Sequence, residues 1–308
     1  MDSRADKAAV RLQLVGGLGN QVFGYMFGRY LTQKGIQIIY DTSEIDRGYT
    51  KHGVFLESLD FEGRFVNFRE KNGLVVYYLR RLSYALQARF PDIPWPRFLA
   101  PCYSASEVGW DVQHELNAAP GMTLRGYFAS YRYFAEVAAV EDDILAIVPR
   151  SPSNFYRDQY AELSKLRFLA VHVRRGDYVG LSGLYGLCGR DYFRDAITKA
   201  SEIAGPWEKI VVFSDDIKES KSLFSEFGDL DVKFIEPVSE SGAEESLMLM
   251  TLATGHVISN SSFSLWGSLL SKTSLITVRP EPWHKGMDTP LDLFPKSWLE
   301  SPSHFLGN

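Results

Sequence analysis

The residues best suited to chemistry lie in one short stretch, VHVRRGDYVG at positions 171–180. Arg174 and Arg175 end an apolar run, with His172 just before them and Asp177 just after. Paired guanidinium groups are planar, permanently charged and shaped to bind phosphate or carboxylate. The following Gly176 allows a turn that could bring both groups together. A structural ion pair with Asp177 is the alternative, but two arginines after a buried strand favour an anion-binding site.

Two more polar clusters follow strand-like runs. Ser214-Asp215-Asp216 comes after 210–213, and Asn260-Ser261-Ser262-Phe263-Ser264 comes after 256–259. Ligands of doubly wound sheets bind outside the carboxyl ends of the strands, so both clusters should share one edge with the arginines. The serine cluster could hold a phosphate at a helix N-terminus. Ordinary helix N-caps are the alternative for both clusters.

A glycine-rich loop, GGLGNQ at 16–21, lies between the first strand-like segment and a predicted helix over 22–34. It resembles a phosphate cradle, but it lacks the third glycine of GxGxxG and the GK[ST] of a P-loop. It indicates close approach of the backbone to a ligand or to a second domain. Gly17, Asn20 and Gln21 are therefore candidate ligand contacts.

The elements that must position these residues alternate between strands and helices. Strands are predicted at 10–15, 36–40, 124–128, 168–173, 210–213, 232–235, 256–259 and 275–278, and helices at 22–34, 75–90, 131–148, 191–203, 217–227, 244–253 and 264–270. Such alternation predicts an α/β protein with parallel sheets covered on both faces. The polar stretch 149–154 is the best linker, which gives domains 1–154 and 155–308. A last helical segment is expected to return to the N-terminal domain.

Composition limits the function classes. The 308-residue chain has a net charge of −5, so it lacks the global basic field of a nucleic-acid-binding protein. Its only cysteines, Cys102 and Cys188, form no disulfide framework and indicate a reducing, cytoplasmic setting. The six histidines show no metal-binding spacing. No signal-peptide or membrane-spanning run occurs, while the basic side of the 75–90 helix is either a solvated face or a membrane-surface or acceptor patch.

Five segments together carry a family resemblance: GGLGNQVFGYMFGRYL, GYFASYRYF, HVRRGDY, FSDD and SNSSFSLWGSLL. In order and spacing, the chain resembles the bacterial α-1,2-fucosyltransferases of glycosyltransferase family 11. The resemblance implies a GT-B-like fold, in which two Rossmann-like domains face a cleft. It implies that the N-terminal domain takes the acceptor and the C-terminal domain binds GDP-β-L-fucose. It also implies an inverting transfer to the 2-hydroxyl of a terminal β-galactoside, with no required metal or cofactor.

The resemblance assigns roles to residues. Arg174 and His172 would contact the diphosphate, and Arg175 would brace the loop or approach the donor sugar. Asp215 would hold the shape of the site. Further donor contacts are expected from Gly17, Asn20, Gln21, Asn260, Ser261, Ser262 and Phe263. The chain departs from the family at Glu244-Glu245-Ser246, where Glu245 and Ser246 would approach the guanine, and at Tyr185-Gly186, where many members have histidine-glycine.

The acceptor hydroxyl needs a positioned base. Asp177 is the first candidate, and a carboxylate that only orients the arginines is the alternative reading of it. The predicted enzyme is a galactoside 2-α-L-fucosyltransferase, cytoplasmic or peripheral at the inner membrane, with a lipid-linked O-antigen or capsule precursor as acceptor. Alternatives are a fucosyltransferase of another linkage or acceptor, a transferase of another sugar, a GDP-sugar-binding protein without turnover, and a phosphohydrolase or kinase.

Overall fold

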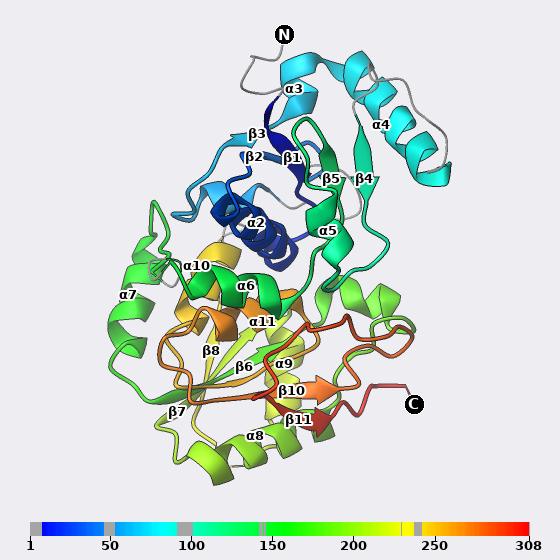
Figure 1. Ribbon diagram of the computed structural model, residues 1–308. Coiled ribbons are helices and arrows are strands. Elements are labelled where there is room, and N and C mark those ends of the chain that lie inside the picture. The colour runs from blue at the N-terminus through cyan, green and yellow to red at the C-terminus, as the bar shows by residue number, and fades with distance from the viewer. Residues whose placement is uncertain are drawn as a thin grey trace. The chain divides into compact units, whose positions relative to one another are not determined.

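The chain folds into two α/β units (Figure 1). The computed structural model describes residues 8–45, 53–90, 101–141, 144, 146–228, 230–236 and 242–307. Unit 1 comprises Met1–Ile144 and Pro290–Phe294, and unit 2 comprises Leu145–Thr289 and Pro295–Asn308. The division falls at 144–145, ahead of the polar stretch 149–154 that the sequence offers as a linker.

Unit 1 is built on a parallel sheet that has five strands within the described residues, in the order β3-β2-β1-β5-β4. These are β1 (Val10–Gln13), β2 (Ile38–Asp41), β3 (Phe65–Val66), β4 (Cys102–Ser104) and β5 (Thr123–Arg125). The helices are α2 (Leu18–Gln33), η1 (Phe55–Glu57), α3 (Phe68–Asn72), α4 (Leu74–Arg89), α5 (Val112–Leu116) and α6 (Tyr131–Ala138). Helix α2 connects the parallel neighbours β1 and β2, which makes the predicted βαβ unit.

Unit 2 has a six-stranded parallel sheet, counted over the residues that the structure describes, in the order β11-β10-β9-β6-β7-β8. Its strands are β6 (Phe168–Val173), β7 (Lys209–Ser214), β8 (Val232–Ile235), β9 (Gly255–Val257), β10 (Ile276–Glu281) and β11 (Leu299–Pro302). Its helices are α7 (Asn154–Leu163), η3 (Gly176–Leu181), α8 (Arg190–Ala204), α9 (Ile217–Phe224), α10 (Gly242–Met250) and α11 (Ser262–Leu269).

The strand order of unit 2 is that of a Rossmann sheet, because the chain starts at β6, runs outward to β8 and then returns to β9 on the other side. The switch point therefore lies between β6 and β9, where ligands of such sheets bind. Strand β6 is buried along its whole length, and Val171 pairs with Val212 of β7 and Val257 of β9. Its continuous apolar run is thus explained by neighbours on both sides and helices on both faces.

Some predicted boundaries differ from the structure. Helix α2 begins at Leu18 rather than Val22, because Gly17 already accepts the first-turn hydrogen bonds from the backbone N–H groups of Asn20 and Gln21. Helix α6 ends at Ala138, well before the predicted end at 148. The expected helical segment at the end of the chain is absent from the described residues 270–307, where β10 and β11 form instead. The segment Pro290–Phe294 groups with unit 1.

None of the helices in the described ranges is both long and apolar enough to span a lipid bilayer.

Candidate functional site

The site in unit 2 begins at the carboxyl end of β6 with Arg174. Its Nη1 lies 2.9 Å from Oδ2 of Asp215, which follows the neighbouring strand β7. The guanidinium also lies over the ring of Tyr178, 5.3 Å from the ring centroid. The side chain remains 22% exposed. Arg174 is thus a cation held in one orientation that a ligand can still reach.

Asp215 positions the loop as well as the arginine. Its Oδ1 accepts a hydrogen bond of 2.8 Å from the backbone N–H of Arg175. A Cβ atom at Gly176 would lie 2.4 Å from Oδ2 of Asp215, so only glycine allows the carboxylate to come this close. The neighbouring Asp216 is an N-cap, because its side chain accepts from the N–H of Glu219 at 2.9 Å. Asp215 therefore contacts both Arg174 and the backbone of Arg175, and Asp216 caps α9.

Arg175 lies inside the protein, with a side chain that is 1% exposed. Its Nε pairs with Oε1 of Glu219 at 2.5 Å, and its Nη1 donates to the carbonyl oxygen of Arg174 at 3.0 Å. Of the two roles expected for this residue, the contacts are those of a brace. The two arginines are consecutive in sequence but point to different surroundings, as expected at the end of a strand.

His172 is buried and lies in β6, two residues before Arg174. Its Nδ1 shares a hydrogen bond of 2.7 Å with Oγ of Ser259, and its ring packs against Phe263 with centroids 5.2 Å apart. Burial, with a smaller contribution from the positive charge of Arg174, lowers the pKa of His172 to about 3. The ring is therefore neutral at physiological pH, and it links β6 to the segment after β9.

The side-chain amide of Asn260 makes its hydrogen bonds within unit 2. Its Nδ2 donates to the carbonyl oxygens of Tyr185 at 2.8 Å and Gly186 at 3.2 Å, and its Oδ1 accepts from the Cys188 thiol at 3.6 Å. The residue is 1% exposed. Since both ends of the amide are engaged inside unit 2, Asn260 holds the 185–188 segment beside the site.

The N-terminus of α11 forms the other side of the edge. Ser261 is the N-cap but makes no side-chain capping bond within the described part of the chain, and the first turn contains no acidic residue. Ser262 and Phe263 are partly exposed, whereas Ser264 is buried and donates to the carbonyl oxygens of Ser259 and Ser261. A helix start of this kind favours an anion through its backbone N–H groups and its dipole.

Three aromatic rings, those of Tyr178, Tyr185 and His284, form a row that no local sequence pattern indicates. The hydroxyl of Tyr178 donates to the carbonyl oxygen of Asn260 at 3.1 Å. Its ring stacks on Tyr185 with centroids 4.7 Å apart, and Tyr185 in turn packs against His284 at 5.4 Å. Tyr178 lies within the HVRRGDY segment, but Tyr185 and His284 are distant in sequence. Only the fold brings them together.

Two expected contacts lie further along unit 2. Both carboxylate oxygens of Glu245 are engaged by Ser153, one by its N–H at 2.6 Å and one by its hydroxyl at 2.7 Å. Glu245 thus ties α10 to the start of α7, which is a structural contact. Ser246 is buried within α10. The backbone of Asp177 lies in η3, but its side chain is outside the described residues, so its role as a base stays a prediction.

In unit 1 the glycine-rich segment 16–21 is stabilised by hydrogen bonds of the Gln21 side chain. The side chain of Gln21 is fully buried; its Nε2 donates to the carbonyl oxygens of Gly16 and Gly53, and its Oε1 accepts from the N–H of Phe55. Asn20 packs beside Gly16, whose φ of +72° suits glycine. Gly17 is the N-cap of α2. These contacts close the loop within unit 1, and the positive φ of Gly16 accounts for glycine at that position.

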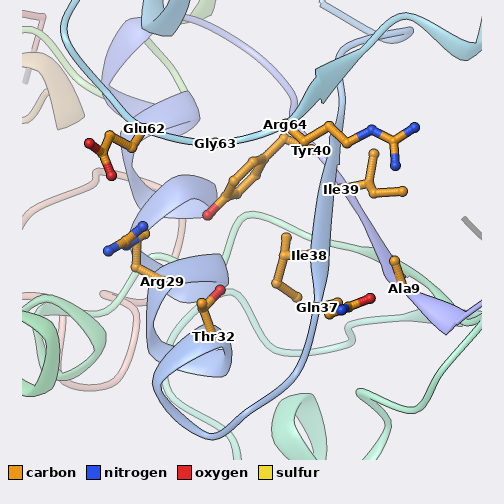
Figure 2. A pocket seen from close by; sticks show the side chains of 10 residues that line it. All are labelled: Ala9, Arg29, Thr32, Gln37, Ile38, Ile39, Tyr40, Glu62, Gly63 and Arg64. Carbon is orange, nitrogen blue, oxygen red and sulfur yellow. The ribbon is translucent and has the colours of Figure 1, made fainter. Parts of the chain in front are cut away.

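Unit 1 also contains a cavity of about 340 Å³ between α2 and β2, lined by Arg29, Thr32, Ile38 and Tyr40 among others (Figure 2). None of the predicted site residues lines it. Arg29 is paired with Glu141 at 2.7 Å, and the hydroxyl of Tyr40 donates to the carbonyl oxygen of Tyr25. The cavity is therefore separate from the chemistry predicted from the sequence.

The fold defines a class: an α/β protein of GT-B-like type with two Rossmann-like units. In the second unit, Arg174 and the N-terminus of α11 lie at the switch-point edge. Over the described residues, no three His, Cys, Asp or Glu side chains gather as a metal site would require.

Residues 120–299 match Glycosyl transferase family 11. The chain is also 31% identical over 304 residues to the alpha-1,2-colitosyltransferase of Escherichia coli, covering 93% of this chain and 97% of that protein. The chain belongs to glycosyl transferase family 11, as its motifs indicated.

Other relatives agree. The O-antigen biosynthesis glycosyltransferase WbnK of Escherichia coli is 32% identical over 124 residues, 38% of this chain and 39% of that one. Among solved structures, the NodZ alpha-1,6-fucosyltransferase soaked with GDP-fucose superposes with a TM-score of 0.52 at 13% identity, covering 92% of this chain and 100% of that one. The fucosyltransferase NodZ from Bradyrhizobium gives a TM-score of 0.52 at 15% identity, over 86% and 93% of the two chains. At such identities the structures establish the fold.

Proposed function

We propose that the protein is a galactoside 2-α-L-fucosyltransferase, which moves L-fucose from GDP-β-L-fucose to the 2-hydroxyl of a terminal β-galactoside. Membership of glycosyl transferase family 11 and the 1,2 linkage in the name of a full-length relative support the reaction type. The fold shared with NodZ supports a GT-B-like enzyme. Unit 2 would bind the nucleotide sugar, and unit 1 would contribute to the acceptor side.

The observation that carries the proposal is the geometry of Arg174. The guanidinium is oriented by Asp215 at 2.9 Å, yet it is 22% exposed at the switch-point edge. The N-terminus of α11 follows β9 at the same edge, and the His172–Phe263 contact joins the two loops. A diphosphate placed there would meet a fixed cation on one side and backbone N–H groups on the other.

The chemistry follows from charge. An oxygen–carbon bond forms between the acceptor 2-hydroxyl and the anomeric carbon of fucose, on the face opposite GDP. The bond from that carbon to the phosphate oxygen breaks, and its electron pair leaves with GDP. Arg174 would stabilise the charge that develops on the diphosphate, an effect of about 3–4 kcal/mol for one well-aimed donor. The proton of the hydroxyl passes to a carboxylate base, for which Asp177 is the candidate.

His172 would act without changing its charge. Because its pKa is lowered to about 3 and its Nδ1 bonds to Ser259, it neither accepts the acceptor proton nor adds positive charge to the site. It would instead fix the two loops at the separation that the diphosphate needs.

A transfer assay tests the proposal. Purified full-length protein is supplied with GDP-fucose and lactose in the presence of EDTA, with GDP-mannose and UDP-galactose as competing donors. We expect fucosyl-lactose from GDP-fucose alone, undiminished by EDTA, because arginine and helix N–H groups would take the place of a metal. Arg174→Ala should lower the rate of transfer about 10²–10³-fold. The control Arg194→Ala, which changes an exposed residue of α8 paired with Asp191, should leave the rate unchanged. Binding of GDP without any transfer would support a sugar-nucleotide-binding protein instead.

Colitosyl transfer is the second candidate, favoured by the 31% identity to the colitosyltransferase over 93% of the chain. Colitose is L-fucose without its 3-hydroxyl, so the two donors differ by one polar group. Running GDP-fucose against GDP-colitose with the same acceptor decides between them. The higher kcat/KM identifies the donor, since a site that hydrogen-bonds the 3-hydroxyl discriminates strongly against its loss.

The natural acceptor is proposed to be a lipid-linked O-antigen or capsule precursor ending in galactose, used at the cytoplasmic side of the inner membrane. The O-antigen role in the name of one relative supports this. Testing extracted lipid-linked oligosaccharide against lactose would separate it from a soluble acceptor.

A further inference from the structure

Helix α4 of unit 1 packs with its polar side inward. The buried side chains of this helix are Tyr77, Ser83, Tyr84 and Gln87. The hydroxyl of Tyr84 bonds to Oγ1 of Thr123 at 3.1 Å, and Oε1 of Gln87 accepts from the N–H of Cys102 at 3.0 Å. These bonds attach the helix to the edge of the sheet at β4 and β5. The orientation of α4 is therefore set by polar contacts.

The apolar residues of α4 lie on its outer face. Val75, Leu79, Leu82 and Leu86 are 73%, 63%, 58% and 38% exposed, respectively. Their spacing of four, three and four residues places them on one stripe of a helix. Tyr78 beside them is 51% exposed. A helix on a water-soluble domain normally turns such a stripe to the core, and a contiguous exposed apolar patch marks an interaction surface.

The chain segment that contains this stripe is predominantly basic. Between Phe68 and Phe90 the chain has five basic residues and one acidic residue, Glu70, in a protein whose net charge is −5. The five are Arg69, Lys71, Arg80, Arg81 and Arg89. Helix α4 itself contains no carboxylate, and the nearest one bonded to it, Glu44, accepts from Tyr77 and pairs with Arg81 at 3.3 Å. The segment that carries the stripe is thus basic, and Arg81 and Arg89 of α4 are exposed.

We propose that α4 docks the protein on an anionic phospholipid surface, lying flat with its apolar stripe among the acyl chains. Amphipathic helices with large apolar residues on one face and arginine on the other bind membranes in this way. The 16 residues of α4 span about 24 Å, which suits a helix parallel to the surface. The exposed Arg81 and Arg89 would meet lipid phosphates, since juxtamembrane basic residues are attracted to anionic headgroups. Docking of this kind does not depend on the proposed transfer reaction.

Charge argues against a second copy of the chain as the occupant. A two-fold contact through α4 would bring each helix against itself, because such an interface uses the same patch on both subunits. Such a contact would add the positive charge of one α4 to that of the other, and α4 itself contains no carboxylate to balance it. An anionic bilayer satisfies both the apolar stripe and the positive charge.

Vesicle sedimentation tests the proposal with the full-length protein. Vesicles of phosphatidylcholine are compared with vesicles that also contain phosphatidylglycerol, over a series of salt concentrations. We expect binding to the anionic vesicles, weakened by salt, and a loss of at least about tenfold in Leu79→Ser/Leu82→Ser. The matched control is Leu116→Ser/Leu275→Ser, which makes the same change at sites that are 68% and 69% exposed outside α4.

Thermal unfolding and transfer to a soluble acceptor are measured for both variants, so that loss of the fold is distinguished from loss of docking. Docking through α4 is supported if the first variant stays folded and loses vesicle binding while the control keeps it. It is overturned if the wild type fails to bind anionic vesicles, or if both variants bind alike. It is also overturned if the wild type is a dimer that Leu79→Ser/Leu82→Ser makes monomeric without any change in vesicle binding. None of these outcomes depends on the identity of the sugar donor.

Discussion

The loop after β1 in unit 1 and the loop after β6 in unit 2 occupy equivalent places in two Rossmann-like sheets. Each follows the first strand of its sheet and contains a glycine that permits close contact. In unit 1 the polar residue, Gln21, is fully buried, and its bonds go to the backbone of its own unit. In unit 2 the polar residue, Arg174, is charged, held by Asp215 and 22% exposed.

The difference shows that a shared strand–turn geometry does not determine whether the loop stabilises the fold or binds a ligand. A neutral amide whose donors and acceptor are all satisfied stabilises a loop, because no group is left for a ligand. An oriented and partly exposed guanidinium can exchange water for phosphate oxygens at little cost in reorganisation. The same strand–turn geometry therefore serves stability in unit 1 and is suited to an anion in unit 2.

Removal of Arg174 should have the largest effect. Arg174→Ala is expected to lower kcat for sugar transfer by about 10²–10³-fold, the usual loss for one donor aimed at developing charge. Arg174→Lys should recover only part of it, since an ammonium lacks the planar fork. Steady-state GDP release measures both. Equal activity of Arg174→Ala and wild type would mean that the diphosphate is bound elsewhere.

The second-largest effect on catalysis is expected from Gly176→Ala, which crowds Asp215. In Gly176→Ala the new Cβ would lie 2.4 Å from Oδ2 of Asp215, so the carboxylate must move and Arg174 loses its orientation. We expect kcat to fall about tenfold with a smaller change in KM, as for a displaced positioning group. Gly180→Ala is the matched control, because a Cβ atom there meets nothing within 4 Å. Similar kinetics for the two variants would contradict the positioning role.

Gln21→Ala should affect stability and leave the nucleotide site alone. The substitution would remove the hydrogen bonds that the amide makes with the N–H of Phe55 and with the carbonyl oxygens of Gly16 and Gly53. A loss of about 2 kcal/mol in the free energy of unfolding is expected. Urea unfolding and GDP titration check it, with the exposed Gln113→Ala as control. A weakened affinity for GDP would show that the glycine loop of unit 1 contacts the donor after all.

The smallest effect at neutral pH is expected at His172, where the prediction concerns the pH dependence of stability. His172 has a folded pKa of about 3, below the ordinary value near 6.5, because it is buried. Above pH 6.5 neither state is protonated and the histidine costs nothing. As the pH falls from 6.5 toward 3, only the unfolded state takes up the proton, so stability decreases by about 1.4 kcal/mol per pH unit. Urea unfolding at several pH values should therefore give a shallower slope for His172→Gln, whatever its stability at pH 7. Parallel slopes would mean that His172 titrates in the folded protein.

Much of unit 2 could be predicted from the chain alone. Strand β6 is predicted with its observed bounds, because five of its six residues are apolar and the run is too short for a helix. Short edge strands such as β3 and β11 were missed, since a few residues without alternation carry no periodic signal. Helix α4 was predicted near its observed bounds, but its amphipathic pattern could not show which side faces the sheet.

The sequence by itself determined the family, the alternation of strands and helices, and the placement of Arg174, Asp215 and Ser261 after strand ends that must share an edge. These follow from local patterns and from the topology of parallel sheets. Only the tertiary structure decided that Arg174 stays accessible while Arg175 is buried against Glu219, and that Gln21 and Asn260 serve the fold. Burial and hydrogen-bond partners depend on residues far apart in the chain, so no local pattern can assign them.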